Sequence, residues 1–289
     1  MTAMPDTPAP WGGLVKELEE WRRRGLQASF WARDDDAIAL TPQLDRLIAA
    51  AAAVHIEIGL AIIPARLTAP LAAYLLSGNA PFYPMCHGWR HVNYSEPMRP
   101  SEFGPDRALP ILIEEAKCAH EAFSQRFGAL PAVFVPPFAR ISPSLIAELP
   151  GVGFRGISIG PAATERRYAR LASYLPASMP FWPALSSQAR RYEVHIDPFD
   201  WRRGGARSRQ AIAREATGYL RARRFGVIPA ARPIGLLLHH LVFDEDTWKI
   251  CQELLAILAS HPSVKWPTIR MFIEDKADAG SSDVKDRAA

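Results

Sequence analysis

The sequence predicts an α/β fold organised as a single (β/α) barrel. Along its 289 residues, short apolar runs alternate with helical patterns seven or eight times. This alternation favours a parallel sheet. No internal repeat or low-complexity block divides the chain, which favours one domain. Several apolar runs also end in charged residues, and (β/α) barrels carry their chemistry at the carboxyl ends of their strands.

Eight apolar runs predict strands, because each is short and is followed by turn-forming or polar residues. They cover residues 28–36, 56–64, 81–88, 132–138, 154–160, 191–201, 233–241 and 264–268. Amphipathic patterns predict the helices, and the best marked of them begins with Thr41 as cap and Pro42 in the first turn. The helices cover residues 13–24, 42–53, 67–76, 107–127, 142–149, 207–223 and 245–259, with a final helix after 268. Residues 161–190 have no periodic pattern and predict an insertion or lid.

Three segments are expected along the chain. Residues 1–24 form an N-terminal tail with a short helix, 25–274 form the barrel, and 275–289 form a flexible polar tail. No basic region followed by an apolar run marks a signal peptide, so we expect a cytoplasmic protein. The longest apolar stretch is interrupted by His55 and Glu57, so no transmembrane segment is expected.

Composition narrows the class of partner. The formal charge is +4, from 34 basic and 30 acidic residues, which is too small to indicate nucleic acid. The three cysteines are widely spaced and odd in number, so they predict neither a disulfide framework nor a paired-cysteine metal site. Arginine clusters such as "WRRGGARSR" at 201–209 are typical of solvated surfaces, or of a site for an anionic substrate.

Polar residues follow five predicted strands at the same end. Charged groups next to a core are costly unless they are paired or bound to a metal, so their recurrence indicates a site. The acids, imidazoles and guanidinium are those of Asp34, Asp35, Asp36, His87, His91, Arg140, Asp197, Asp200, His239 and His240, and Pro137, Phe138 and Trp201 lie beside them in the sequence. One carboxylate and two imidazoles can hold zinc or a similar divalent ion. Because adjacent strand residues face opposite ways, at most one of His239 and His240 should point into the site.

These motifs resemble those of the polysaccharide deacetylase family, also described as NodB-homology domains or carbohydrate esterase family four. The five motifs occur in the order of the family, over about residues 28–270. They are "ARDDD" (32–36), "HGWRH" (87–91), "VPPFAR" (135–140), "DPFDW" (197–201) and "LLLHH" (236–240). The resemblance implies the distorted seven-stranded barrel of that family.

The resemblance also implies a role for each residue. Asp34 would be the catalytic base, Asp35, His87 and His91 would hold the metal, and His239 would be the general acid. Pro137, Phe138, Asp197, Trp201 and His240 would line the substrate site or support it. The activity would be removal of an acetyl group from an N-acetylated, or O-acetylated, carbohydrate-like substrate by a metal-bound water. Zinc is the first candidate for the ion, with cobalt, manganese and nickel as alternatives.

Three departures from the family pattern leave choices open. Val135 stands where the family has an arginine, and we expect Arg140, or alternatively Arg33, to supply a partner for Asp200. Asp36 replaces a glycine, so it could bind substrate or act as an outer-shell ligand of the metal, and the base could be Asp34 or Asp36. Gly88 replaces a hydroxyl residue between the two histidines.

Two other functions remain open for the same barrel. It could hydrolyse a C–N bond in a non-sugar amide, or it could bind a sugar or a partner without catalysis. The substrate is expected to be a small molecule or glycan, and the arginine-rich loops would suit an anionic one. The sequence does not indicate an oligomeric state.

Overall fold

The protein is described by a computed structural model, which covers residues 9–175, 191–271 and 273. Seven parallel strands form the wall of a barrel in the order β9-β1-β2-β3-β4-β5-β6. Their bounds are Ala28–Ala37 (β1), Ile58–Ile62 (β2), Phe82–His87 (β3), Val133–Val135 (β4), Gly156–Ile159 (β5), Arg191–Glu193 (β6) and Ile234–Leu238 (β9). A parallel bridge between Ile196 and Leu236 joins the chain after β6 to β9. The predicted seven-stranded (β/α) barrel is therefore confirmed.

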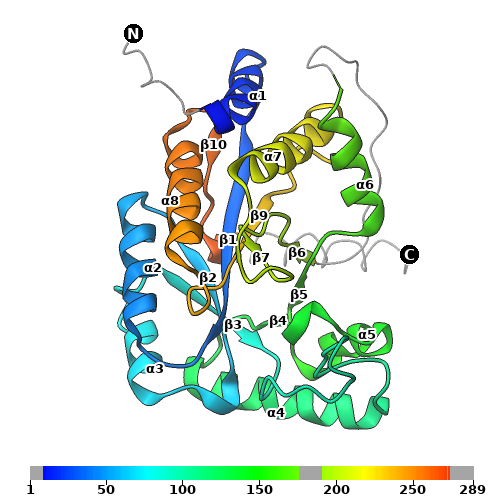
Figure 1. Ribbon diagram of the computed structural model, residues 1–289. Helices are drawn as coiled ribbons and strands as arrows, with labels where there is room; N and C mark the ends of the chain where they lie inside the picture. Colours follow the sequence, from blue (N-terminus) through cyan, green and yellow to red (C-terminus); the bar gives the residue numbers. More distant parts are fainter. Residues whose placement is uncertain (1–8, 176–190, 272, 274–289) are drawn as a thin grey trace, which may run out of the picture.

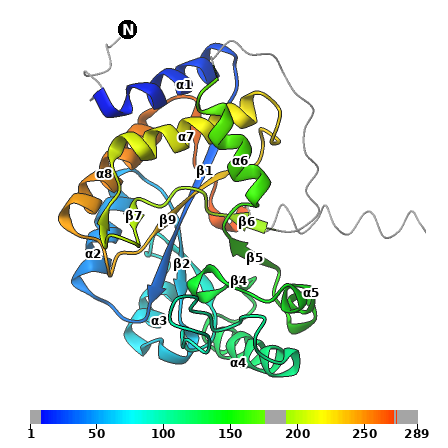
Figure 2. The same ribbon diagram turned by 45° about the vertical axis from the view of Figure 1, so that its right-hand side comes forward.

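Helices surround this wall (Figure 1). They are Gly12–Arg23 (α1), Pro42–Ala53 (α2), Ala69–Leu76 (α3), Leu109–Phe127 (α4), Pro143–Val152 (α5), Ala163–Ala172 (α6), Arg209–Arg224 (α7) and Glu245–Ser260 (α8). Short 3-10 turns lie at Ala9–Trp11 (η1), Pro64–Arg66 (η2) and Pro137–Ala139 (η3). Helix α1 lies beside α7 in both views (Figure 1, Figure 2). Within the described ranges, every helix is too short or too polar to cross a membrane.

Three short strands complete the fold. β10 (Val264–Lys265) pairs in parallel with the start of β1, as the expected eighth strand. β7 (Phe199–Asp200) and β8 (Gly205–Ala206) form an antiparallel hairpin outside the barrel. The predicted strand 191–201 is thus wrong in its length, because the chain leaves the wall shortly after β6.

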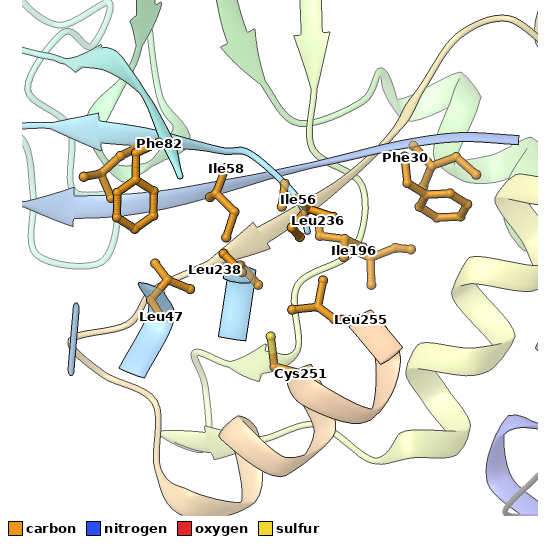
Figure 3. Packing of buried hydrophobic residues seen from close by; sticks show 14 of the residues in the cluster. Phe30, Leu47, Ile56, Ile58, Phe82, Ile196, Leu236, Leu238, Cys251 and Leu255 are labelled. Carbon is orange, nitrogen blue, oxygen red and sulfur yellow. The ribbon is translucent and has the colours of Figure 1, made fainter. Parts of the chain in front are cut away.

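Alternation along the strands divides the core into two layers. On β1, Phe30 and Ala32 face the helices, while Trp31 faces the barrel interior. Figure 3 shows the outer layer, where Phe30 and Leu236 of the strands pack with Leu255 of α8. The inner layer is a smaller cluster to which β2, β3, β4 and β6 also contribute. Because side chains alternate in this way, the parity of a residue decides which layer it enters.

Helix α6 corrects the expectation of an irregular stretch over residues 161–190, whose part from 176 to 190 lies outside the described residues. The buried face of α6 is formed by Glu165, Ala169 and Ala172, so it carries no strongly apolar period. Glu165 is buried because it is paired: its carboxylate lies 3.3 Å from Arg223 and 3.4 Å from Arg232. A charged residue on the inner face therefore concealed the helix.

A buried histidine belongs to the same network. The Nδ1 atom of His195 accepts a hydrogen bond from the backbone N–H of Gly235 at 2.9 Å, so Nε2 carries the proton and faces Glu165 at 3.1 Å. Burial and the nearby Arg223 lower the pKa of His195 to about 4, despite the opposing effect of Glu165. His195 is therefore neutral in the folded protein.

This neutral histidine predicts a loss of stability in mild acid. The unfolded chain binds a proton at His195 below pH 6.5, its ordinary pKa, whereas the folded protein does so only near pH 4. The free energy of unfolding should fall by about 2 kcal/mol between pH 7.5 and pH 5. Urea unfolding at both pH values would measure it. In His195→Asn, the amide oxygen can still accept the hydrogen bond from Gly235, and the free energy of unfolding should fall clearly less between the two pH values. An equal fall in both proteins would contradict the neutral state assigned to His195.

Candidate functional site

A bulge at the end of β1 gives three consecutive aspartates different directions. Arg33 and Asp35 follow the inward alternation, whereas Asp34 follows the outward one. The pairing with β2 shifts register after Asp34, and Asp36 has a φ of 72°. Aspartate tolerates this left-handed conformation better than most residues. Because a bulge re-aims a side chain, Asp36 can face the barrel mouth together with Asp35.

Asp34, the expected base, is fully buried on the outer side of the barrel wall. Its Oδ1 accepts from the backbone N–H of His240 at 2.8 Å, and its Oδ2 lies 2.5 Å from Nδ1 of the same histidine. Burial and the nearby Asp34 charge raise the pKa of Cys251 in α8 to about 12. Asp34 and His240 therefore form a pair between the wall and α8, away from the mouth.

Asp36, His87 and His91 meet at the mouth, and we call them the mouth triad. Asp36 Oδ1 lies 3.1 Å from Nε2 of His87 and 3.1 Å from Nε2 of His91. The three ligand atoms lie within 4.8 Å of one another. Nδ1 of His87 donates to the carbonyl of Val135 at 3.1 Å, so Nε2, which faces Asp36, is the atom that would bind a metal. The geometry thus brings Asp36 to the two expected histidines, in the position that the sequence assigned to Asp35.

The charges of the mouth triad suit a divalent ion. Burial would raise the pKa of Asp36, but the hydrogen bond from His87 and the charges of both histidines outweigh it and hold the pKa well below its usual range. Burial and the neighbouring His87 lower the pKa of His91. Asp36 is 27% exposed and His91 20% in their side chains, so the group is open on one side. An ionised carboxylate and two imidazoles with an open side are the donors of a catalytic zinc site.

Asp35 is held from behind by Arg33. The guanidinium forms a bidentate pair with the carboxylate, at 2.7 and 2.8 Å, and also donates to the Oγ of Ser158 at 2.6 Å and to its carbonyl at 3.0 Å. Both charged side chains are nearly fully buried. Burial alone would raise the pKa of Asp35, but the charges of Arg33 and His87 lower it overall. Asp35 is therefore an oriented, ionised carboxylate beside the mouth triad.

His239 faces Asp35 across the mouth. Its Nε2 lies 3.9 Å from Oδ2 of Asp35, too far for a hydrogen bond, and its buried Nδ1 has no partner among the described residues. The ring packs edge-on against Trp201, with centroids 4.6 Å apart. Asp197 accepts from Nε1 of Trp201 at 2.9 Å and thereby fixes this aromatic neighbour. An unpartnered buried imidazole at an open mouth is available to a ligand.

The expected pair of Asp200 and Arg140 does not form within the described part of the chain. Asp200 accepts from the backbone N–H groups of Arg202 at 3.0 Å and Arg203 at 3.3 Å, so it closes the β7–β8 turn. Arg140 is exposed and lines a separate cavity. Arg33, which was the alternative to Arg140, is the buried arginine of the site, but it pairs with Asp35 and not with Asp200.

Glu102 organises the loop between the two histidines. Its buried carboxylate accepts from the backbone N–H groups of Trp89 at 3.2 Å and Arg90 at 2.7 Å, and a backbone hydrogen bond from His91 also acts on it. Gly88 has a φ of 57°, and a Cβ there would lie 2.3 Å from Oε2 of Glu102. Glycine is therefore required, because a side chain would occupy the place of this carboxylate.

Phe138 forms the other side of the mouth triad. Its ring lies 4.4 Å from the ring of His91, and its φ of 59° is unusual for a residue with a side chain. The Cγ of the preceding residue, the buried Pro137, would lie 2.4 Å from a Cβ at Gly88. The expected third-motif residues Pro137 and Phe138 thus support the histidine loop.

Replacing Gly88 with Ala should loosen the mouth triad. The alanine would be strained in the left-handed backbone conformation, and its Cβ would clash with the carboxylate of Glu102. We expect zinc affinity to fall by about 10- to 100-fold, which is the usual effect of disturbing the groups that orient metal ligands. Zinc titration against a chromogenic chelator would measure it. The control is Gly78→Ala, which has a similar φ of 76° but nothing within 4 Å of the new Cβ. Equal zinc affinities in the two variants would contradict the role of this contact.

Two supporting residues were not foreseen from the sequence, Glu102 and Ser158. Glu102 lies in an irregular proline-containing loop, 11 residues after His91, where no spacing rule applies. Ser158 occupies a position on β5 whose side chain faces the barrel interior. A polar serine within the otherwise apolar "GISI" is the sequence feature that could have indicated it.

Comparison with known proteins gives a likeness at the level of structure. No family model matches the chain and no curated protein matches it. A mutant of the peptidoglycan deacetylase PdaC from Bacillus subtilis is 11% identical and covers 91% of this chain and 98% of its own, with a TM-score of 0.50. A family 4 carbohydrate esterase from Streptomyces lividans is 12% identical, covers 84% and 93%, and has a TM-score of 0.49. This chain therefore shares the fold of the PdaC deacetylase, while its activity has to be inferred from its own residues.

Proposed function

We propose that the protein is a metal-dependent hydrolase that removes an acetyl group from an N-acetylated carbohydrate-like substrate. The observation that supports this most is the convergence of the mouth triad, the Asp35–Arg33 pair and His239, whose Nδ1 has no hydrogen bond among the described residues, on one barrel mouth. The shared fold and the order of the sequence motifs agree with it.

Asp36, His87 and His91 would hold the ion, with zinc as the first candidate. A divalent ion there would supply Lewis acidity, which polarises a carbonyl and favours the ionisation of water. Assigning Asp36 to the metal and Asp35 to the base moves both expected roles one residue along β1. The inward parity of Asp35 and the bulge at Asp36 are the reasons for this change.

Asp35 would accept the proton of the attacking water. Its low pKa keeps it ionised at neutral pH, and the bidentate Arg33 fixes its orientation. His239 would donate a proton to the leaving amine from the opposite side of the mouth. The exposed Trp201 beside it offers an aromatic face to the apolar side of a sugar ring, which supports a carbohydrate rather than a simple amide.

The test combines metal analysis with acetate release. Wild-type protein reconstituted with zinc, cobalt, manganese or nickel should bind about one ion and release acetate from N-acetyl sugars. His87→Ala should lose both properties, whereas His239→Gln should keep the ion and lose turnover. Acetate release only from non-sugar amides would indicate the alternative hydrolase. Tight metal binding without any turnover would indicate a non-catalytic binding barrel.

A further inference from the structure

A cavity of about 560 Å³ opens at the same end of the barrel strands as the mouth triad. It lies where β4 and β5 end, and its wall includes Ala139 and Gly160. Ala139 directly follows Phe138, whose ring contacts His91. The lining of the cavity therefore begins one residue along the chain from the ring that contacts His91, and the cavity has the volume of a small-molecule site.

Three arginines converge on this cavity. Arg99, Arg140 and Arg166 all line it, and Asp106 is the one acid in the lining. None of the three guanidinium groups lies within ion-pair distance of a carboxylate in residues 9–175, 191–271 or 273, although Arg166 donates to the carbonyl of Pro161. The three side chains are exposed, so water solvates each charge, but together they give the cavity a positive potential that attracts anions. The uncompensated charge therefore indicates an anionic ligand.

A buried hydroxyl points to the same conclusion. Ser101 lines the cavity, is only 2% exposed, and its Oγ has no hydrogen-bond partner among the described residues. A buried polar atom without a partner is rare in native proteins and is usually satisfied by a ligand or water. A hydroxyl can donate to an anionic oxygen, so Ser101 would complement the arginines once its Oγ, which has almost no accessible surface in the free protein, turns toward the cavity.

We propose that this cavity binds an anionic group of the substrate, a phosphate or a carboxylate, while the acetamido group lies at the mouth triad. The proposal rests on the proposed function and names the substrate class: an acetylated sugar that carries a negative charge. Arg99 and Arg140 would hold the anion through paired N–H donors, which match the oxygens of phosphate and carboxylate. Ser101 would donate a further hydrogen bond.

The first experiment does not depend on turnover. Inorganic phosphate is titrated calorimetrically into metal-free protein, so that no metal ion captures it. Wild-type protein should bind phosphate, and binding should weaken as salt is added. Arg99→Ala/Arg140→Ala should abolish binding, and Ser101→Ala should weaken it several-fold at unchanged stability. Arg126→Ala, an exposed arginine at the end of α4, is the matched control and should bind as wild type does. No binding, or equal binding by the double variant, would overturn the proposal.

The second experiment compares acetate release from N-acetylglucosamine, its 6-phosphate and N-acetylmuramic acid. At least one charged compound should have a kcat/KM about 10-fold or more above the neutral sugar, as expected for one charge-assisted contact. The Arg99→Ala/Arg140→Ala variant should lose this advantage through KM, with kcat and the neutral sugar unaffected. Acetate release without preference for charge would overturn the anion site and leave the deacetylase intact. Phosphate binding at the arginines without acetate release would instead overturn the proposed function.

Discussion

Replacing Asp36 with Asn is expected to lower zinc affinity by at least about 100-fold. Loss of a group that only orients a metal ligand already lowers metal affinity by about 10- to 100-fold, and Asp36 would be a ligand itself. Asp36 contacts both imidazoles through one carboxylate oxygen, and its amide counterpart would lack the charge that balances a divalent ion. Acetate release should fall to the level of metal-free protein. Chelator competition and a zinc-supplemented activity assay measure the two effects separately.

Asp35→Asn is the matched control for this change. It removes a carboxylate from the adjacent position, but Asp35 is bound to Arg33 and does not join the triad. Zinc affinity should change little, while turnover should fall by about 10²- to 10⁴-fold, as expected for the loss of a general base. The opposite pattern, in which Asp35→Asn loses zinc and Asp36→Asn retains it, would restore the ligand assignment expected from the sequence.

Replacing Arg33 with Met is expected to lower the free energy of unfolding by about 3–5 kcal/mol, because it leaves Asp35 as a buried carboxylate without its partner. Both side chains are almost inaccessible, and Ser158 would lose a donor as well. Urea unfolding of the metal-free protein measures the effect without a contribution from bound zinc.

The double variant Arg33→Met/Asp35→Asn separates charge from packing. Removing both charges should recover part of the stability, since the penalty arises from the uncompensated ion. Arg140→Met is the surface control and should change stability by no more than about 0.5 kcal/mol. If the double variant were as unstable as Arg33→Met, loss of packing rather than of charge would explain the result.

The alternation of side chains along β1, and its interruption by a bulge, explain why the sequence predicts the arrangement of the site only in part. Alternation from Trp31 places Arg33 and Asp35 in the barrel interior and Asp34 outside, and this could have been inferred from the apolar pattern alone. The position of Asp36 could not, because a bulge breaks the alternation and depends on pairing with β2. The fold was accessible because seven strands repeat one simple pattern, whereas the site depends on one local irregularity.

The Arg140–Asp200 pair expected from the third motif does not form among the described residues, for a different reason. The sequence suggested that a guanidinium close to the prolines should serve the site, and Arg140 met that condition. The barrel interior instead allows Arg33 to act from the same strand as its partner, with Ser158 as support from β5. Motif spacing describes neighbours along the chain and cannot describe neighbours across a closed sheet.

The cage of N–H groups around Glu102 has a consequence for metal exchange. A loop whose amides are already held by a carboxylate loses little conformational entropy when an ion arrives. In zinc fingers, by contrast, the metal supplies the free energy of folding, and chelation unfolds the chain. Here a chelator should remove the proposed ion from a barrel that keeps its shape. Successive cycles of removal and refilling should then leave the protein intact, and different divalent ions can be compared in one sample.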